Sequence, residues 1–391
     1  MSTLPTIRVL HVINGEHYAG AERVQDLLSA ALPEFGVEIV LAALKPDQFA
    51  AKRRHREAPL YEVPMRSRYD LRPAIALRRI AQIERCRLIH THTVRAALVG
   101  RVASSLTGLP MVHHLHSPTT AETTRSLRNL FNAAVERIST CNIAAAVAVS
   151  QSLARYGSEH GIPAERMHVV HNGVPIAAEF ADRPTPRGTW TLGCMALFRP
   201  RKGLETLLDA LYQLRDAGLP VRLRAVGKFE TPEYEREIHA HVERLGVGDL
   251  IEWRGFRSDI AAEFAAMDLF VLPSLFGEGL PMVMLEAMSL GVPVVATRVE
   301  GVPDAIDDGR SGLIVDPGEP TSLALAIRQV IAGEVDWQSL RNNARRTQVE
   351  RFSDRSMAAS TAALYRNILG EVEPAQTIAV NTAELELQEC V

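Results

Sequence analysis

Two glutamates eight positions apart mark the stretch of this chain whose residue types best suit ligand binding. Glu278 lies in a turn rich in glycine and proline, and Glu286 lies inside a largely apolar run that continues to Val295. A carboxylate in such a run is costly to bury unless a partner hydrogen-bonds it. Pro281 suits the first position of a helix, and the amides after it would be free to bind an anion. The stretch therefore predicts a site for a nucleotide sugar, with carboxylates for hydroxyls and amides for phosphate.

A basic loop is the second candidate for phosphate binding. Arg199 and Lys202 stand in the segment Arg-Pro-Arg-Lys-Gly, between a predicted strand and a predicted helix. Arginine can bind phosphate through two hydrogen bonds, and lysine acts as a point charge. Ligands of open α/β sheets bind at the carboxyl ends of the strands, where this loop is expected. A solvated basic turn is the alternative interpretation.

A glycine-bounded loop follows the first predicted strand. It runs from Asn14 to Gly20 and includes Gly15. Glycines let the backbone approach a ligand closely, and the helix that follows would favour an anion. The spacing is not G-x-G-x-x-G, so it does not indicate a dinucleotide site. A plain tight turn accounts for both glycines equally well.

Histidines gather at two predicted strand ends. They are His90, His92, His113, His114 and His116. Metal binding is one option, but neither cysteine nor a carboxylate accompanies them at ligand spacing. We therefore expect no metal and a hydrogen-bonding role at the mouth of a cleft, with a structural histidine as the alternative for any one of them. His116, before Ser-Pro, is the best placed in a loop.

Alternating strand and helix patterns occur in both halves of the chain, which predicts two parallel sheets covered on both faces. Predicted strands of the first half are 7–13, 38–42, 88–91, 111–115, 145–149 and a short one at 169–170. Those of the second are 191–196, 221–226, 250–253, 269–272, 293–296 and 313–315. A proline-containing stretch at 173–190 separates the halves. The α/β domains predicted are 1–175 and 176–352, followed by a helix at 353–370 and an acidic flexible tail at 371–391.

Composition is typical of a globular enzyme, with 47% hydrophobic and 23% charged residues in 391. The four cysteines form no C-x-x-C pair, and the chain shows no secretion signal pattern, so we expect a cytoplasmic protein. Residues 1–180 carry 21 basic and 15 acidic residues, and residues 52–87 carry 11 and 4. This basic region predicts contact with an anionic membrane or a phosphate-bearing acceptor. A solvated arginine-rich surface is an equally good interpretation.

Together these motifs resemble the retaining glycosyltransferases of family four, which have the GT-B architecture of two Rossmann-like domains facing across a cleft. The second half carries the basic loop 199–203, the E-x7-E block within E-G-L-P-x-V-x-L-E-A-M, and the segments 291–297 and 312–317. The first half adds G-A-E-R-V at 20–24, H-T-H at 90–92, and N-G-V at 172–174. Three positions depart from the usual pattern: Leu197, where arginine is common, Glu300, where glycine is usual, and Pro175, where an acid often follows.

The resemblance implies a role for each candidate residue. Glu286 would hold the donor ribose, and Glu278 with the amides of Gly279 and Leu280 would hold the donor sugar. Lys202 with Arg199 would neutralise the departing diphosphate, so that no metal or other cofactor is required. His116 would lie beside the reacting centre, and the Gly20 loop beside the phosphates and acceptor. The last helix would cross back onto the N-terminal domain.

From these observations we expect an enzyme that moves a hexose-type sugar, with retention, from a UDP-, GDP- or ADP-sugar. The expected acceptor is a lipid-linked, polysaccharide or other glycan precursor at the inner face of the cytoplasmic membrane, and no nucleic acid partner is expected. Two alternatives stay open: an epimerase or hydrolase of the same fold, and a catalytically silent nucleotide-sugar-binding protein.

Overall fold

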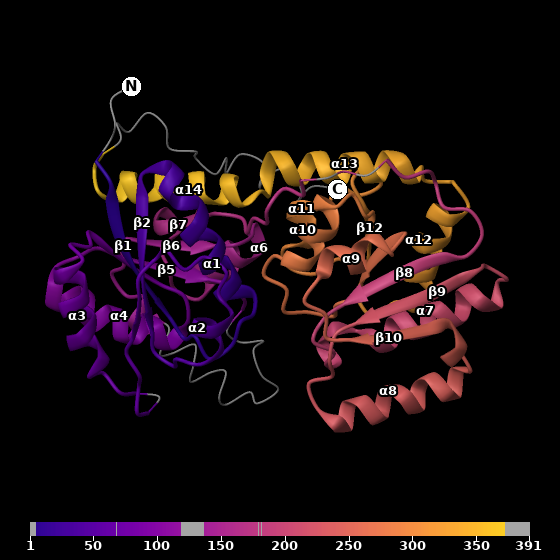
Figure 1. The fold of residues 1–391 in the computed structure, drawn as a ribbon, viewed down its shortest axis with the longest axis horizontal. Helices are drawn as coiled ribbons and strands as arrows, with labels where there is room; N and C mark the ends of the chain where they lie inside the picture. Colours follow the sequence, from indigo (N-terminus) through magenta and orange to yellow (C-terminus); the bar gives the residue numbers. More distant parts are fainter. Residues whose placement is uncertain (1–4, 68, 119–136, 179, 181, 372–391) are drawn as a thin grey trace.

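Two parallel β-sheets form the framework of the protein, one in each lobe (Figure 1). The computed structural model describes residues 5–67, 69–118, 137–178, 180 and 182–371. Strands of the first sheet are β1 (Ile7–Ile13), β2 (Val37–Ala43), β3 (Leu60–Glu62), β4 (Leu88–Thr91), β5 (Met111–Leu115), β6 (Ala145–Ala148) and β7 (Met167–Val169). They lie in the order β3-β2-β1-β4-β5-β6-β7, and all neighbours are parallel.

The second sheet has six strands in the order β10-β9-β8-β11-β12-β13, again all parallel. They are β8 (Trp190–Met195), β9 (Val221–Val226), β10 (Ile251–Gly255), β11 (Leu269–Leu272), β12 (Val294–Thr297) and β13 (Leu313–Val315). The predicted α/β fold with two Rossmann-like units is confirmed. The predicted domain boundary, residue 176, lies between β7 and β8.

Helices cover both faces of each sheet, which explains why the strands are apolar on both sides. The first lobe contains α1 (Gly20–Ala31), η1 (Leu32–Phe35), α2 (Gln48–Lys52), α3 (Pro73–Ile83), α4 (Val94–Thr107) and α6 (Gln151–Glu159). Along β1, Val9 belongs to the core shared with α1, whereas the next residue, Leu10, belongs to the core shared with α3 and α4. This alternation is what the two-residue period of a strand requires.

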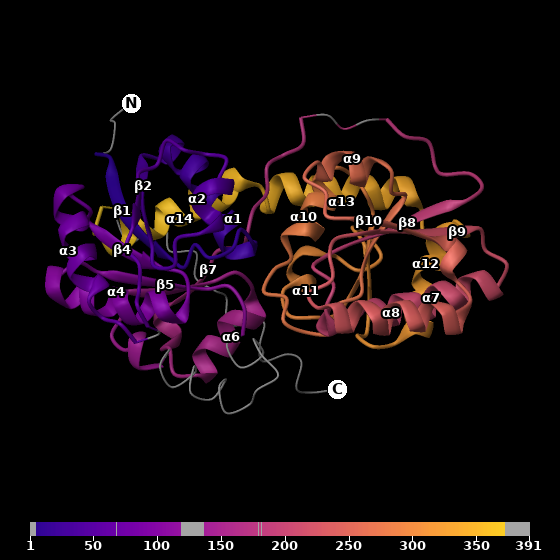
Figure 2. The same cartoon turned by 60° about the horizontal axis from the view of Figure 1, so that its bottom comes forward.

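The second lobe repeats the arrangement. Its helices are α7 (Leu204–Asp216), α8 (Pro232–Leu245), α9 (Ile260–Ala265), α10 (Met282–Ser289), α11 (Val302–Ala305), α12 (Pro320–Ile331) and α13 (Trp337–Arg351). In both views α7 and α8 lie on one side of the sheet, and α9, α10 and α13 lie on the other (Figure 1 and Figure 2). Among the described helices, none combines the length and apolar character needed to cross a bilayer.

The last helix, α14 (Asp354–Ile368), returns to the first lobe, as the resemblance implied (Figure 1). Its Tyr365 is completely buried, and the hydroxyl lies 2.5 Å from His90 Nδ1 and 3.0 Å from His11 Nε2. Arg366 donates to the Phe35 carbonyl oxygen at 3.0 Å, and it also pairs with Glu371. The predicted flexible tail lies outside the described residues from 372 onward.

The sequence prediction gave no bounds for β3, α11 and α13, nor for α2, α3, α4 and α6 of the first lobe. The first two are short, and the α13 sequence is strongly polar, so its apolar period is weak. The position predicted for Pro281 was also wrong. Its backbone is extended, with ψ of 112°, so that Pro281 is the N-cap and α10 begins at Met282.

The N-G-V segment at 172–174 has a structural role at the start of α14. Val174 exchanges backbone hydrogen bonds with Phe352 and Asp354, at 3.0 and 3.1 Å. Gly173 lies so close to this turn that a Cβ on it would be 2.1 Å from the Ser353 carbonyl oxygen. The segment that follows the first sheet is therefore held against the start of α14 by backbone hydrogen bonds.

The variant Gly173→Ala tests this contact. We expect it to lower the free energy of unfolding by about 1–3 kcal/mol, because the added methyl would have to displace backbone rather than a flexible side chain. Gly248→Ala is the matched control, since its Cβ would meet only Val242 Cγ1 at an ordinary 3.6 Å. Urea unfolding should leave the control within about 0.5 kcal/mol of the wild type. Equal stability of both variants would contradict the assignment.

Candidate functional site

Loops at the carboxyl ends of the second sheet bring Lys202 and Glu278 together. Lys202 ends the short helix η4 (Pro200–Lys202) between β8 and α7, and Glu278 lies in the loop between β11 and α10. Lys202 Nζ forms an ion pair with Glu278 Oε1, and Ser274 Oγ donates to the same oxygen at 2.6 Å. The predicted convergence of the basic loop and the first glutamate is therefore present.

Opposing effects determine the protonation of Glu278. Burial alone would raise the pKa of this carboxyl, but Lys202, Ser274 and Arg201 together outweigh burial and lower the pKa below its ordinary value. The two side chains of the pair are only 15% and 9% exposed. The ion pair is thus largely shielded from water, and the loss of either partner would leave a charge without compensation.

Arg201 and Glu300 hold the loop that carries Glu278. Arg201 Nη1 donates to the Gly277 carbonyl oxygen at 2.7 Å, and the Glu300 carboxylate accepts from the amides of Gly277 and Glu278 at 2.7 and 2.9 Å. Gly277 has a φ of +79°, which favours glycine. Sequence reasoning placed Arg201 in the basic loop as a candidate for phosphate and Glu300 in a backbone loop beside the same cleft, but gave neither side chain this supporting role. The signal available was Glu300 itself, an acid where the resemblance leads one to expect glycine.

Arg199 has a different partner from the one expected. Its Nη1 donates to Glu230 Oε1 at 3.2 Å, whereas Lys202 pairs with Glu278. Its Nε is buried and has no hydrogen-bond partner within the described part of the chain. Only one of the guanidinium nitrogens of Arg199 is therefore engaged by Glu230.

Glu286 is paired across the two lobes. It lies in α10, its side chain is 9% exposed, and it forms an ion pair with Arg23 Nη2 from α1 in the first lobe. The buried carboxylate that was anomalous in the sequence thus has a cationic partner. Sequence reasoning missed Arg23 as that partner, although it stands three residues after Gly20 within the G-A-E-R-V motif.

The two glycines of the first-lobe loop differ in their surroundings. Gly15 has a φ of +83°, and a Cβ on it would lie 3.1 Å from Ala43 Cβ of β2, as in a tight turn. Gly20 begins α1, and a Cβ there would meet no atom within 4 Å. Only Gly20 therefore has open space beside it.

Close backbone contact joins the E-G-L-P turn to the first lobe. A Cβ on Gly279 would lie 2.0 Å from the His116 carbonyl oxygen, so only glycine fits. Asn172 Nδ2 donates to the Leu280 carbonyl oxygen at 3.0 Å, and Gly301 packs against the Gly279 carbonyl in the same way. His116, Gly279 and Leu280, which were predicted from separate motifs, thus meet where the lobes touch.

Asp304 makes a further contact between the lobes. Its carboxylate accepts from the backbone amide of Gln151 at 2.7 Å and lies 3.0 Å from His171 Nε2. Gln151 begins α6 of the first lobe, where an acidic partner is favourable.

Four of the predicted histidines form one cluster behind this interface, and His11 of β1 joins them; the four are His90, His92, His114 and His116. His113 lies apart from these rings, with its Nδ1 2.9 Å from Thr91 Oγ1. Ring centroids of His90 and His92 are 4.2 Å apart, and those of His114 and His116 are 4.1 Å apart. Burial lowers the pKa of His116 to about 3 and that of His11 to about 4, so the rings are neutral at pH 7. His116 Nε2 lies 3.2 Å from His92 Nδ1.

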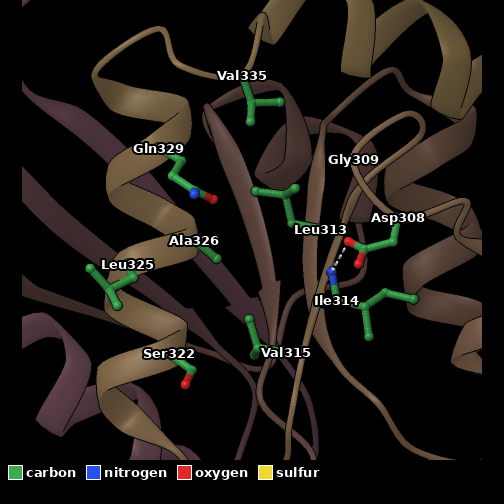
Figure 3. A pocket seen from close by; sticks show the side chains of 10 residues that line it. All are labelled: Asp308, Gly309, Leu313, Ile314, Val315, Ser322, Leu325, Ala326, Gln329 and Val335. Atoms are coloured by element: carbon green, nitrogen blue, oxygen red, sulfur yellow. Dashed lines mark hydrogen bonds between the residues drawn. The ribbon is translucent and has the colours of Figure 1, made fainter.

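A cavity of about 460 Å³ lies elsewhere, between β13 and α12 (Figure 3). Its lining is mostly aliphatic, with Gln329, Ser322 and Asp308 as polar members, and Asp308 Oδ1 accepts from the Ile314 amide at 2.8 Å. None of the predicted site residues lines it, so we place the candidate site at the facing loops of the two lobes.

Family comparison covers both lobes. A model described as "Glycosyltransferase Family 4" matches residues 18–178, and one described as "Glycosyl transferases group 1" matches residues 189–333. The chain belongs to the family 4 glycosyltransferases. These two matched ranges contain every candidate residue except Gly15, including Arg23, Arg201 and Glu300.

Several curated relatives of this family 4 chain are named as glycosyltransferases. The putative colanic acid biosynthesis glycosyltransferase WcaL of Salmonella typhimurium is 30% identical over 220 residues, which is 53% of each chain. The D-inositol 3-phosphate glycosyltransferase of Streptomyces bingchenggensis is 28% identical over 313 residues, covering 71% of this chain and 66% of that protein. This chain spans about half the length of the first such relatives.

Solved structures share the fold at lower sequence identity. HepE from Anabaena, solved in complex with UDP, has a TM-score of 0.82 and 23% identity over 92% of this chain and all of its own. Sucrose-phosphate synthase from Thermosynechococcus elongatus has a TM-score of 0.77 and 20% identity, over 93% of this chain and all of its own. The GT-B architecture is thereby confirmed.

Removing the cation in Lys202→Met tests the buried ion pair. We expect a loss of about 3–5 kcal/mol in the free energy of unfolding at pH 7, because Glu278 stays buried without its partner. The lowered pKa of Glu278 makes the wild-type pair stabilising above the ordinary value of 4.5, and this contribution is lost as the pH falls through the folded-state pKa. In the variant, burial raises the pKa of Glu278, so the deficit should shrink towards pH 4.

The control for this measurement is Arg236→Met, which breaks an exposed pair with Glu233 whose side chains are 70% and 67% exposed. Exposed pairs contribute about 0–1 kcal/mol, so the control should stay near wild type at every pH. A Lys202→Met deficit that does not change between pH 7 and pH 4 would refute the linkage.

Proposed function

We propose that this family 4 protein is a retaining glycosyltransferase that moves a hexose-type sugar from a nucleoside diphosphate sugar onto a glycan-precursor hydroxyl. The observation that carries the proposal is the meeting of Lys202, Glu278, Gly279 and His116 at the facing edges of the two lobes. Similar structures are described as complexes with UDP, with UDP and glucose, and with UDP-glucose, which supports a nucleotide-sugar donor.

The ion pairs of the cleft suggest how a donor would be held. Glu286 would exchange Arg23 for the ribose hydroxyls, and Glu278 would share its oxygens with the sugar. Lys202 would then face the diphosphate. As the sugar–phosphate bond breaks, negative charge grows on the phosphate oxygens, and a fixed cation in a water-poor site stabilises that charge. Arg23, once released, would lie beside the same phosphates.

The amide groups beside Glu278 divide into two sets. Glu300 already occupies the amides of Gly277 and Glu278, so these two cannot bind the donor at the same time. The amides of Gly279 and Leu280, and those that begin α10, are the ones we assign to the sugar and phosphate. His116, neutral because burial lowers its pKa to about 3, would accept or donate one hydrogen bond there without adding charge.

For the acceptor, we propose a lipid-linked or polysaccharide precursor at the inner face of the cytoplasmic membrane. Relatives named for colanic acid and lipopolysaccharide core biosynthesis motivate this choice. Helix α3 supplies a surface of suitable chemistry. Its exposed positions include Ile75 and Ile83, which are 55% and 73% exposed, with Arg78 and Arg79 between them. Apolar side chains flanked by arginines favour an anionic lipid surface.

A calorimetric screen of UDP-, GDP- and ADP-sugars tests the donor proposal. We expect one of them to bind, and Glu286→Ala to weaken it by roughly 5- to 150-fold, because the loss of a buried hydrogen-bonding partner costs about 1–3 kcal/mol. Glu233→Ala, an exposed glutamate on α8, is the control and should bind as the wild type does. Failure to bind any of these donors would overturn the proposal.

Product analysis separates the transferase from the two alternative functions. A new glycosidic product only when acceptor is present supports transfer, whereas a changed sugar without acceptor indicates an epimerase or hydrolase. A silent binding protein would retain cellular function in Lys202→Ala and Glu278→Ala.

Co-sedimentation with vesicles tests the membrane part separately. We expect binding that requires anionic lipid and falls with salt. The double variant Arg78→Glu with Arg79→Glu should weaken it by more than about 30-fold, because each basic residue near such a surface contributes about 1 kcal/mol. The matched control reverses two exposed arginines of the second lobe, Arg236→Glu with Arg310→Glu. Binding that ignores lipid charge and salt would remove this part of the proposal.

A further inference from the structure

Three imidazoles meet where β1 and β4 lie side by side: His11 comes from β1, His90 from β4, and His92 follows β4 directly. The rings of His11, His90 and His92 lie with centroids 4.2–5.0 Å apart, and all three side chains are buried. Gln25 of α1 and Tyr365 of α14 complete the group. Solvent does not reach these nitrogens, so each one needs a partner within the cluster.

With neutral rings, the hydrogen-bond donors and acceptors of His11, His92 and Gln25 cannot all be paired. Gln25 lies between His11 Nδ1, at 2.6 Å, and His92 Nδ1, at 2.9 Å, and His92 Nε2 lies 3.1 Å from His11 Nδ1. If the Gln25 oxygen faces His11, His11 Nδ1 must donate to it, and the Gln25 NH2 donates to His92 Nδ1, so a neutral His92 carries its proton on Nε2. Two N–H groups, His11 Nδ1–H and His92 Nε2–H, then face each other. If the Gln25 side-chain amide is turned, neither His11 Nδ1 nor His92 Nε2 carries a proton, and two lone pairs face each other.

The remaining neighbours add to this mismatch. His90 Nε2 is buried with no hydrogen-bond partner within the described residues, and so are both ring nitrogens of His114. The cluster therefore presents buried ring nitrogens whose lone pairs have no hydrogen-bond donor among the described residues.

We propose that His11, His90 and His92 bind one divalent transition-metal ion of the zinc type. One nitrogen from each ring lies within 4.8 Å of the others. Zinc–nitrogen bonds of about 2.0–2.1 Å place two ligands of a tetrahedral ion roughly 3.3 Å apart, close to the 3.1 Å between His92 Nε2 and His11 Nδ1. Imidazole is a ligand that suits this class of metal.

The outer contacts have the form expected around a metal site. Histidine ligands usually donate their second ring N–H to an oxygen, which fixes the ring. The Tyr365 hydroxyl can accept from both His90 Nδ1 and His11 Nε2. Gln25 lies 2.6 Å from His11 Nδ1 and would have to turn away from that nitrogen for the ion to bind, after which its side-chain oxygen could accept from His92 Nδ1. An ion here would therefore be structural, joining β1 and β4 beneath α14.

This inference is independent of the proposed function, because none of the three ligands belongs to the donor site. It revises the expectation from the sequence that the histidines bind no metal. That expectation lacked His11, which is separated from His92 by 81 positions and enters the group only through the pairing of β1 with β4.

Zinc binding to the full chain, freed of any affinity tag and stripped with a chelator, tests the proposal. Competition with a chromogenic chelator should give one zinc per chain, and cobalt in its place should show the visible absorption of a tetrahedral nitrogen site. His92→Gln should weaken zinc binding by more than 100-fold, and Tyr365→Phe by about 10- to 100-fold, as for an outer-shell partner. His160→Gln, an exposed histidine on the surface, should leave it unchanged.

Circular dichroism establishes whether each variant is folded. If His92→Gln does not fold, the wild-type cobalt spectrum and the Tyr365→Phe affinity decide the matter. Absence of stoichiometric zinc in the wild type, or zinc binding retained in folded His92→Gln, would overturn the proposal. Equal losses in His160→Gln and His92→Gln would do the same, because they would show binding by surface histidines only.

Discussion

The pairing of Arg23 with Glu286 is the contact on which the arrangement of the cleft depends. One partner comes from the first helix of the first lobe, and the other is a largely buried carboxylate in an apolar helix of the second lobe. A buried carboxylate without a cation is strongly unfavourable. The contact between the lobes therefore supplies the buried Glu286 carboxylate with a cation, Arg23, that lies in the first lobe.

Lys202 and Glu278 form a second shielded ion pair, and both of its partners lie in the second lobe. Their pairing crosses from the loop after β8 to the loop after β11, and Arg201 and Glu300 fix both loops through backbone contacts. The cleft thus contains acids matched with cations that are equally suited to phosphate. On the proposed function, a donor with hydroxyls and a diphosphate would offer each side of these pairs a new partner.

Much of this arrangement could be predicted from the sequence, because it follows from local patterns. Buried strands such as Leu269–Leu272 are short apolar runs, so their limits were predicted within a residue or two. The meeting of Lys202 with Glu278 followed from the rule that loops at the carboxyl ends of parallel strands share an edge. The E-x7-E block identified the family because its spacing is specific.

What could not be predicted depends on contacts between distant segments. Nothing local to Arg23 shows that it meets Glu286, 263 positions later, and nothing local to Arg199 shows that Glu230 will engage it. Helix α13 lacked an apolar period because its buried positions include Arg341 and Gln348. The histidines were visible as a group, but their proton balance depends on Gln25 and Tyr365, which belong to helices at opposite ends of the chain.

Because α14 packs on the first lobe, the first lobe cannot finish folding until residues near the end of the chain have been synthesised. Tyr365 is made 275 positions after His90, the ring beside which its hydroxyl lies. At a translation rate of about 5–20 residues per second, roughly 15–55 s pass between the two. During that interval the histidine cluster lacks its contacts with Tyr365 of α14. The histidines of a nascent first lobe are therefore fully buried only after α14 has been synthesised.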